Sequence, residues 1–190
     1  MSNASNVSAA KPKVEGGIWI APLGTTLPKN ATEALNESFK TLGYVSEDGM
    51  TNENNSDSED IKEWGGTTVL KISTEKTDNF KFKLIETLNV EVLKFVYGQK
   101  NVSGTIDTGI KIKANGDFID PCAMVIEMIM NGGILKRIVI PRAQLSELSE
   151  VEYVNNDAIG YEVTVAALSH TDSDGQYNHL EFISKPTQSL

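Results

Sequence analysis

The sequence predicts a mainly β protein, an antiparallel β-sandwich or barrel with one flanking α-helix. Apolar runs of strand length recur along the chain and are separated by clusters of Gly, Asn and Asp. Only one segment has convincing helical periodicity, and it lies between two groups of strand-like runs. Strands and helices do not alternate as they would around a parallel sheet, so an antiparallel sheet with a helix packed on one side is favoured.

The N-terminal part of the chain predicts an arm, a strand and one ambiguous segment. Residues 1–15 are small, polar and aperiodic, so we expect a flexible arm. Residues 18–21 form the first predicted strand, which Pro22 ends. Residues 30–42 fit either a short helix capped by Asn30 or an irregular crossover, and the sequence leaves both open.

A long polar segment follows, for which we predict a loop over residues 46–66. Residues 52–60 contain no apolar side chain, so this stretch cannot bury surface to offset its own ordering entropy. Loops of this length in compact domains are usually functional or disordered. We therefore expect an assembly or binding element here. Its candidate residues are Asp48, Gly49, Met50, Asp57, Asp60, Trp64, Gly65 and Gly66.

The one predicted helix spans residues 87–98. Thr87 or Asn89 can cap its first turn, and Gly98 suits the position just after its end. Its apolar residues recur on one face, which predicts packing against the core. These residues are Leu88, Val92, Leu93, Phe95 and Val96.

Strands are predicted on both sides of the helix. They span residues 67–72, 80–85, 109–114, 123–130, 134–140, 148–154, 160–168 and 180–183. Residues 77–79 supply a turn between the first two, and residues 115–117 a tight turn later. Asn131-Gly132-Gly133 marks the clearest hairpin, and residues 155–157 join the last long pair.

Length and charge narrow the class of protein. A chain of 190 residues suffices for one domain, expected over residues 16–183 with a C-terminal tail at 184–190. A net charge of −9 argues against nucleic acid as a bound partner, because phosphate binding needs clustered Lys and Arg. No signal peptide and no run of roughly 20 apolar residues is visible, so we expect synthesis in a cytoplasm and no membrane contact.

The residues do not predict an enzyme, a metal site or a cofactor. Cys122 is the only cysteine, so no intrachain disulfide can form, and we expect a small buried strand residue. His170 and His179 cannot complete a zinc site with it. Residues 172–175 lack the spacing of a calcium loop and are expected to form an exposed hairpin turn. Carboxylates on a polar loop are not held rigidly enough for catalysis.

Several segments taken together resemble the major tail tube protein of long-tailed (siphovirus-type) bacteriophages, especially those of Gram-positive hosts. They are GGIWIAPLGTTLP at 16–28, LGYVSEDGM at 42–50, Trp64-Gly65-Gly66, and the strand–helix–strand block that ends at Tyr97-Gly98. The resemblance covers residues 16–183. The order and spacing of the segments carry it, because none of them is specific alone.

The resemblance implies a structural virion protein with no catalytic residues. Six copies would form a ring, and rings would stack into the tail tube that conducts DNA during ejection without specific binding. Implied partners are other copies of the chain, the tape measure protein, the tail terminator and distal tail or baseplate proteins. Residues 46–66 occupy the position of a loop that reaches a neighbouring ring, and the terminal arms would also bridge subunits. The tube would be assembled in the host cytoplasm.

Two other functions fit a small β domain. One is a different phage tail or baseplate component of similar fold. The other is a β-sandwich carbohydrate-binding module, which needs exposed aromatic side chains on a rigid face. Trp19 and Trp64 are the only tryptophans, and both lie near glycines in core or hinge positions.

Overall fold

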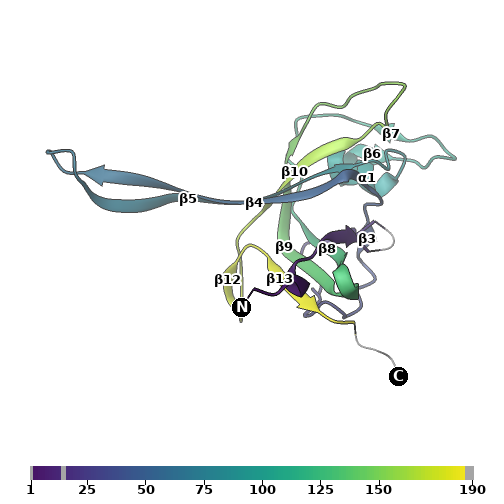
Figure 1. Ribbon diagram of the computed structural model, residues 1–190. Coiled ribbons are helices and arrows are strands. Elements are labelled where there is room, and N and C mark those ends of the chain that lie inside the picture. The colour runs from purple at the N-terminus through teal and green to yellow at the C-terminus, as the bar shows by residue number, and fades with distance from the viewer. Residues whose placement is uncertain (1, 14–15, 187–190) are drawn as a thin grey trace.

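The computed structural model describes residues 2–13 and 16–186 (Figure 1). Met1, residues 14–15 and residues 187–190, which belong to the expected terminal segments, lie outside the described part. The prediction of a mainly β fold with one short helix is confirmed. Its principal sheet is antiparallel, and it is open rather than closed into a barrel.

The principal sheet contains most of the strands. In chain order they are β1 (Ala10–Pro12), β2 (Ile18–Pro22), β3 (Lys40–Thr41), β4 (Val45–Lys62), β5 (Thr68–Leu84), β8 (Cys122–Met130), β9 (Leu135–Leu148), β10 (Tyr161–Ala167) and β13 (Leu180–Ser184). Their order across the sheet is β3-β2-β8-β9-β10-β5-β4, with β1 added beside β8 and β13 beside β9. The two ends of this order are therefore β3 and β4.

Two small hairpins stand outside the principal sheet. One pairs β6 (Val102–Ser103) with β7 (Lys111–Ile112), and the other pairs β11 (His170–Asp172) with β12 (Gly175–Tyr177). Short 3-10 turns occur at Ala4–Asn6, Gln99–Asn101 and Asn131–Gly133.

Helix α1 (Val90–Tyr97) begins three residues later than predicted. Asn89 caps it, since its side-chain oxygen accepts a hydrogen bond of 3.0 Å from the backbone N–H of Glu91. Gly98 ends it with a positive φ of 93° and donates its N–H to Lys94 O. Four residues of the predicted apolar stripe are buried, namely Val92, Leu93, Phe95 and Val96. Leu88 precedes the helix and is exposed.

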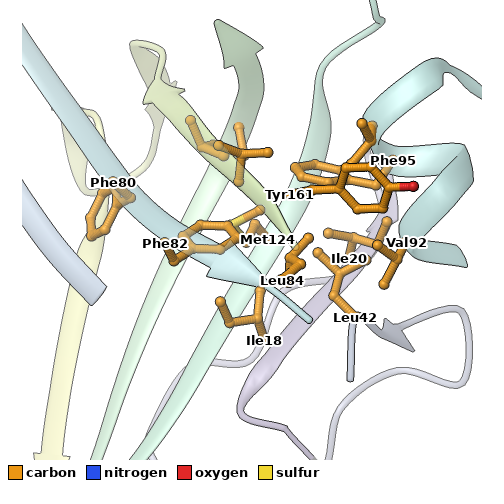
Figure 2. Packing of buried hydrophobic residues seen from close by; sticks show 14 of the residues in the cluster. Ile18, Ile20, Leu42, Phe80, Phe82, Leu84, Val92, Phe95, Met124 and Tyr161 are labelled. Atoms are coloured by element: carbon orange, nitrogen blue, oxygen red, sulfur yellow. The ribbon is translucent and has the colours of Figure 1, made fainter. Parts of the chain in front are cut away.

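The core has two layers, one on each face of the central strands. Helix α1 covers one face, where Val92 and Phe95 point toward Leu84 and Tyr161 (Figure 2). A smaller cluster on the other face contains Ala21, Phe39, Ala123, Val125 and Val139, with Leu180 and Phe182 of β13 packed against it. Strands β8 and β9 are therefore buried on both faces, which explains their nearly continuous apolar sequences.

The crossover from β2 to β3 contains no helix, so the irregular alternative for residues 30–42 is the correct one. Asn30 does cap a turn, because its side-chain oxygen accepts hydrogen bonds from the N–H groups of Thr32 and Glu33. The turn is not continued into a helix, and Phe39 anchors the end of the crossover in the second cluster.

The sheet after the helix agrees with the prediction in part. Asn131-Gly132-Gly133 does connect a hairpin, β8 with β9, and Gly132 and Gly133 have the positive φ values that only glycine adopts readily. The predicted strand at 109–114 shrinks to the two residues of β7, and the tight turn predicted at 115–117 lies in an irregular segment.

The strand predicted at 148–154 is wrong. Strand β9 continues from Leu135 through Leu148 as one 14-residue strand, and residues 149–160 form the connection to β10. Val151 produced the apolar pattern on which the prediction of this strand rested. It packs against the core from the connection without joining the sheet. Strand β10 does pair with the strand before it, but with residues 143–148 of β9 and not with the predicted strand at 148–154.

Part of the segment expected to be a flexible arm is a strand. Residues Ala10–Pro12 pair with Met130, Ile129 and Met128 of β8, and all three are exposed. This strand is held by backbone hydrogen bonds to β8 while its side chains are exposed. The sequence therefore contains no apolar pattern that predicts it.

Candidate assembly interface

The long segment predicted as a loop is the outer strand of a projecting hairpin, which corrects that prediction. Strand β4 spans 18 residues and pairs with β5 from Val45, opposite Leu84, to Lys62, opposite Thr68. Figure 1 shows the two strands leaving the body side by side. The connection at residues 63–67 is the true turn, whereas the predicted turn at 77–79 lies inside β5.

Strand β10 pairs with β5 only as far as Asn79, so the hairpin leaves the sheet at that point. We call residues 54–78 the arm. Opposing charges and hydroxyls line up across it, including Lys71 Nζ to Asp60 at 4.0 Å and Ser56 Oγ to Ser73 Oγ at 3.4 Å. Cross-strand hydrogen bonds pair the backbone N–H and C=O groups of the two strands here.

Both edges of the arm are open. Strand β4 ends the sheet order, and β5 has no partner on its other side beyond Asn79 among the described residues. Each edge therefore presents unpaired backbone N–H and C=O groups, which is a template for pairing with another chain. The chain does not protect these edges with proline, since no proline occurs from residue 29 to residue 120.

The tip of the arm is apolar, unlike the rest of it. Trp64 at the turn is fully exposed, and Ile61, Leu70 and Ile72 are 43–54% exposed. Ile61 lies directly opposite Leu70, and Ile72 is two residues further along β5, so the three share one face. Clustered apolar side chains at the end of a polar projection indicate a contact surface.

The turn that carries Trp64 is well defined. Gly66 adopts a positive φ of 87° and donates its N–H to Glu63 O at 2.9 Å. Backbone hydrogen bonds from Gly65 and Thr67 lower the pKa of the Glu63 carboxyl. The indole is thus presented by a structured turn.

The predicted site residues are spread along the hairpin rather than gathered. Trp64, Gly65 and Gly66 are at the tip, whereas Asp57 and Asp60 lie on the arm. The remaining three lie near the body, where the β4–β5 register is irregular between Val45 and Met50. Of these, Asp48 and Gly49 are exposed, and Met50 packs against the core.

Sequence reasoning missed the apolar tip residues on β5. Leu70 and Ile72 belong to the strand predicted at residues 67–72, which was not included in the predicted assembly element. The signal that could have found them is the polar sequence of residues 52–60, which leaves only Ile61 as an apolar residue facing them across the hairpin.

Charge is divided between the two strands of the hairpin. Residues 46–66 contain seven acidic residues and one lysine, while β5 contains four lysines and two acidic residues. The acidic residues of the first strand and turn are Glu47, Asp48, Glu53, Asp57, Glu59, Asp60 and Glu63. The outer strand β4 is therefore acidic, whereas the open part of β5, residues 68–78, contains two lysines and two acidic residues and has no net charge.

A buried polar cluster lies where the arm leaves the body. The Asp78 carboxylate is almost fully buried, and its two oxygens accept separate hydrogen bonds. Asn52 Nδ2 donates to Oδ1 at 2.8 Å, and His179 Nδ1 lies 2.5 Å from Oδ2. The His179 ring also contacts Phe80 edge-on, with centroids 5.3 Å apart. Residues from β4, β5 and the C-terminal segment thus meet at one carboxylate.

The structure also locates the other residues that the sequence analysis considered as possible sites, namely Cys122, His170 and residues 172–175. Cys122 is half-buried at the start of β8, and burial raises the pKa of its thiol to about 12. His170 lies against Asp172 and Tyr177, far along the chain from Cys122. Residues 172–175 form the exposed turn between β11 and β12, as predicted.

Three further observations concern ligands and membranes. No three His, Cys, Asp or Glu side chains gather at a possible metal site in residues 2–13 and 16–186. Within the same residues, no helix has the length and hydropathy to cross a membrane. Trp19 packs against the second core cluster and Trp64 is at the arm tip, so the two do not form an aromatic platform for a sugar.

An open sheet that projects a long hairpin with uncovered edges and an apolar tip is the architecture of a self-associating structural protein. Comparison with known protein families identifies the family to which this structural protein belongs. The chain belongs to the phage tail tube protein family, whose model matches residues 3–189. The chain is thus a structural component of a phage tail tube and not an enzyme. The predicted resemblance is confirmed at this level.

One solved structure that the chain matches is described as "Cryo-EM Structure of an Extracellular Contractile Injection System, PVC sheath-tube complex in extended state". The match has 9% sequence identity and a TM-score of 0.43, and it covers 92% of this chain and 93% of that chain. No curated protein matches the chain in sequence.

Proposed function

We propose that six copies of this chain close into a ring and that rings stack into the tail tube of a long-tailed phage, the conduit for DNA ejection. The observation that carries this proposal is the arm, residues 54–78. It has two open edges, an apolar tip and no packing partner among residues 2–13 and 16–186. Exposure of this surface to water is unfavourable. Contact with another copy of the chain removes that exposure.

Ring closure follows from the open sheet. One end of the strand order is β3 and the other is β4, so two different edges are available on each copy. Pairing of unlike edges is heterologous, and it generates a closed ring when the rotation per copy divides a full turn. The acidic β4 edge favours a basic partner, which sets the direction of the pairing.

Stacking follows from the length of the arm. Its β4 half, residues 54–62, extends by about 30 Å at the usual rise per strand residue. The tip therefore lies well beyond its own body, where it reaches a copy in the adjacent ring. Trp64 and the apolar face of Ile61, Leu70 and Ile72 become buried there.

The remaining partners follow from a tube of this kind. The tape measure protein occupies the lumen during assembly, and terminator and distal tail or baseplate proteins close the two ends. DNA passes through without specific binding, because a chain of net charge −9 offers phosphates no cluster of cations. Assembly takes place in the host cytoplasm, and the product is the virion tail.

Electron microscopy of the concentrated protein tests the proposal. We expect rings and tubes from the parent chain and only monomers from a Trp64→Ala, Leu70→Ser double variant. Phe118→Ser is the matched control, because Phe118 is also an exposed aromatic residue but lies outside the arm. Tubes from the double variant, or loss of tubes in the control alone, would contradict the role of the arm.

A further inference from the structure

The polar cluster at Asp78 lies at the point where the arm begins. The last residue of β5 that pairs with β10 is Asn79, opposite Ala166, and Asp78 is the next residue outward. From here to the tip the hairpin has no neighbouring strand among the described residues. Contacts that hold Asp78 in place therefore also set the direction in which the arm leaves the sheet.

Asp78 is held from two sides by side chains of other segments. Asn52 of β4 donates to one carboxylate oxygen, and the same amide also donates to Asn79 O at 3.2 Å. His179 binds the other oxygen. With a side-chain exposure of 2% for Asp78 and 15% for His179, water competes little for the bond between these two side chains.

His179 connects this point to the C-terminal segment. It immediately precedes β13, which pairs with the central strand β9 from Leu180, opposite Val139. Leu180 and Phe182 pack against the second core cluster, so His179 projects from an anchored backbone. The edge-on contact with Phe80, a fully buried residue of β5, fixes the orientation of the imidazole ring.

We propose that Asn52, Asp78 and His179 form a clasp by which the C-terminal segment sets the angle of the arm. The clasp residues are positioning residues: they do not contact another copy but aim the tip at it. The consequence for assembly rests on the proposed function, because an arm free to swing must lose more conformational entropy when it docks.

Pairwise distances measured by electron spin resonance test the clasp on the isolated protein. Spin labels at Ser58→Cys on the arm and Ser103→Cys on the body, both exposed positions, are placed in a Cys122→Ala background. We expect the distance distribution to become at least twice as wide in His179→Ala. His170→Ala, which changes the other histidine of the same segment, should leave the width unchanged.

Two further variants separate positioning from general destabilisation. His179→Asn should restore the narrow distribution, because the asparagine amide nitrogen can donate from near the position of Nδ1. Asn52→Ala changes an exposed side chain, so it should fold even if His179→Ala does not, and it should widen the distribution in the same direction. Unchanged widths in both alanine variants would overturn the proposal.

Tube formation gives the second readout. We expect the yield of tubes to fall at least tenfold in His179→Ala and to recover in His179→Asn. A widened distribution with a normal yield of tubes would overturn the claim that the clasp governs assembly. If the parent protein formed no tubes, the proposed function would fail, while the distance measurements would still decide whether the clasp aims the arm.

Discussion

Phe95 is the largest of the four buried residues that attach helix α1 to the sheet. Its side chain is 4% exposed within the larger core cluster, beside Tyr161 (Figure 2). Phe95→Ala should therefore lower the free energy of unfolding by about 3–5 kcal/mol, from lost transfer energy plus a cavity. Denaturant unfolding measures this change. Leu88→Ala, which removes an exposed side chain next to the helix, should change stability by less than about 0.5 kcal/mol. Equal effects would show that the helix does not pack as described.

Cys122 should be an unreactive thiol. Burial raises its pKa to about 12, so at pH 8 very little of it is the thiolate that attacks disulfide reagents. We expect labelling in the folded protein to be at least tenfold slower than in the urea-unfolded chain. The raised pKa also makes stability depend on pH. The thiol loses its proton at a lower pH in the unfolded chain than in the folded chain, so the free energy of unfolding falls as the pH rises from 9 toward 12. Fast labelling of the folded chain would contradict burial of the thiol.

Glu127 illustrates a residue whose role the sequence hides. It interrupts the apolar run of β8, yet it is buried, and its carboxylate binds Arg137 on the adjacent strand and Lys13 from the N-terminal segment. A buried charge is tolerated because it is paired and hydrogen-bonded. Arg137 lies directly opposite Glu127 in the β8–β9 hairpin, but Lys13 is 114 residues away from Glu127, so no local pattern could predict that second pair.

Among the elements, those with a strong local signal were predicted well. Helix α1 combines a capping Asn89, an apolar stripe and a terminal Gly98, and each of these acts over a few residues. The β8–β9 hairpin likewise has two apolar runs around Asn131-Gly132-Gly133. In such cases propensity, capping and turn chemistry agree, which is when sequence reasoning succeeds.

The arm could not be predicted as a hairpin, for a physical reason. Both faces of residues 54–60 are exposed, so its strand has no alternation of apolar and polar residues. Backbone pairing with β5 holds it, and pairing depends on a partner strand rather than on side-chain type. The same absence of apolar residues did indicate correctly that this segment lies outside the core.

Shortening the arm should separate folding from assembly. Replacing residues 56–76 with Asn-Gly leaves Asn55 opposite Thr77 as the last register pair and retains the clasp at Asp78. Because the arm does not pack on the body, we expect a cooperative thermal melt with a transition temperature within a few degrees of the parent. Tubes should be absent by electron microscopy. An unfolded chain by circular dichroism, or normal tubes, would contradict this prediction.

For the whole molecule, the excess of acidic residues governs how copies approach one another. With a net charge of −9 per copy, repulsion opposes assembly, and salt screens it with a length near 10 Å at about 0.1 M. Tube growth followed by light scattering should therefore become faster as salt is raised. Tubes that dissolve at moderate salt would mean that opposite charges across the interface dominate.

The central claim is that the arm joins copies of this chain into a tube, and a cryo-electron microscopy reconstruction of the assembled parent protein tests it most directly. We expect stacked rings of six copies in which residues 54–78 leave one copy and Trp64 is buried against another. Tubes in which the arm is free in solvent would contradict the account, as would a protein that remains monomeric at high concentration and at every salt concentration tested.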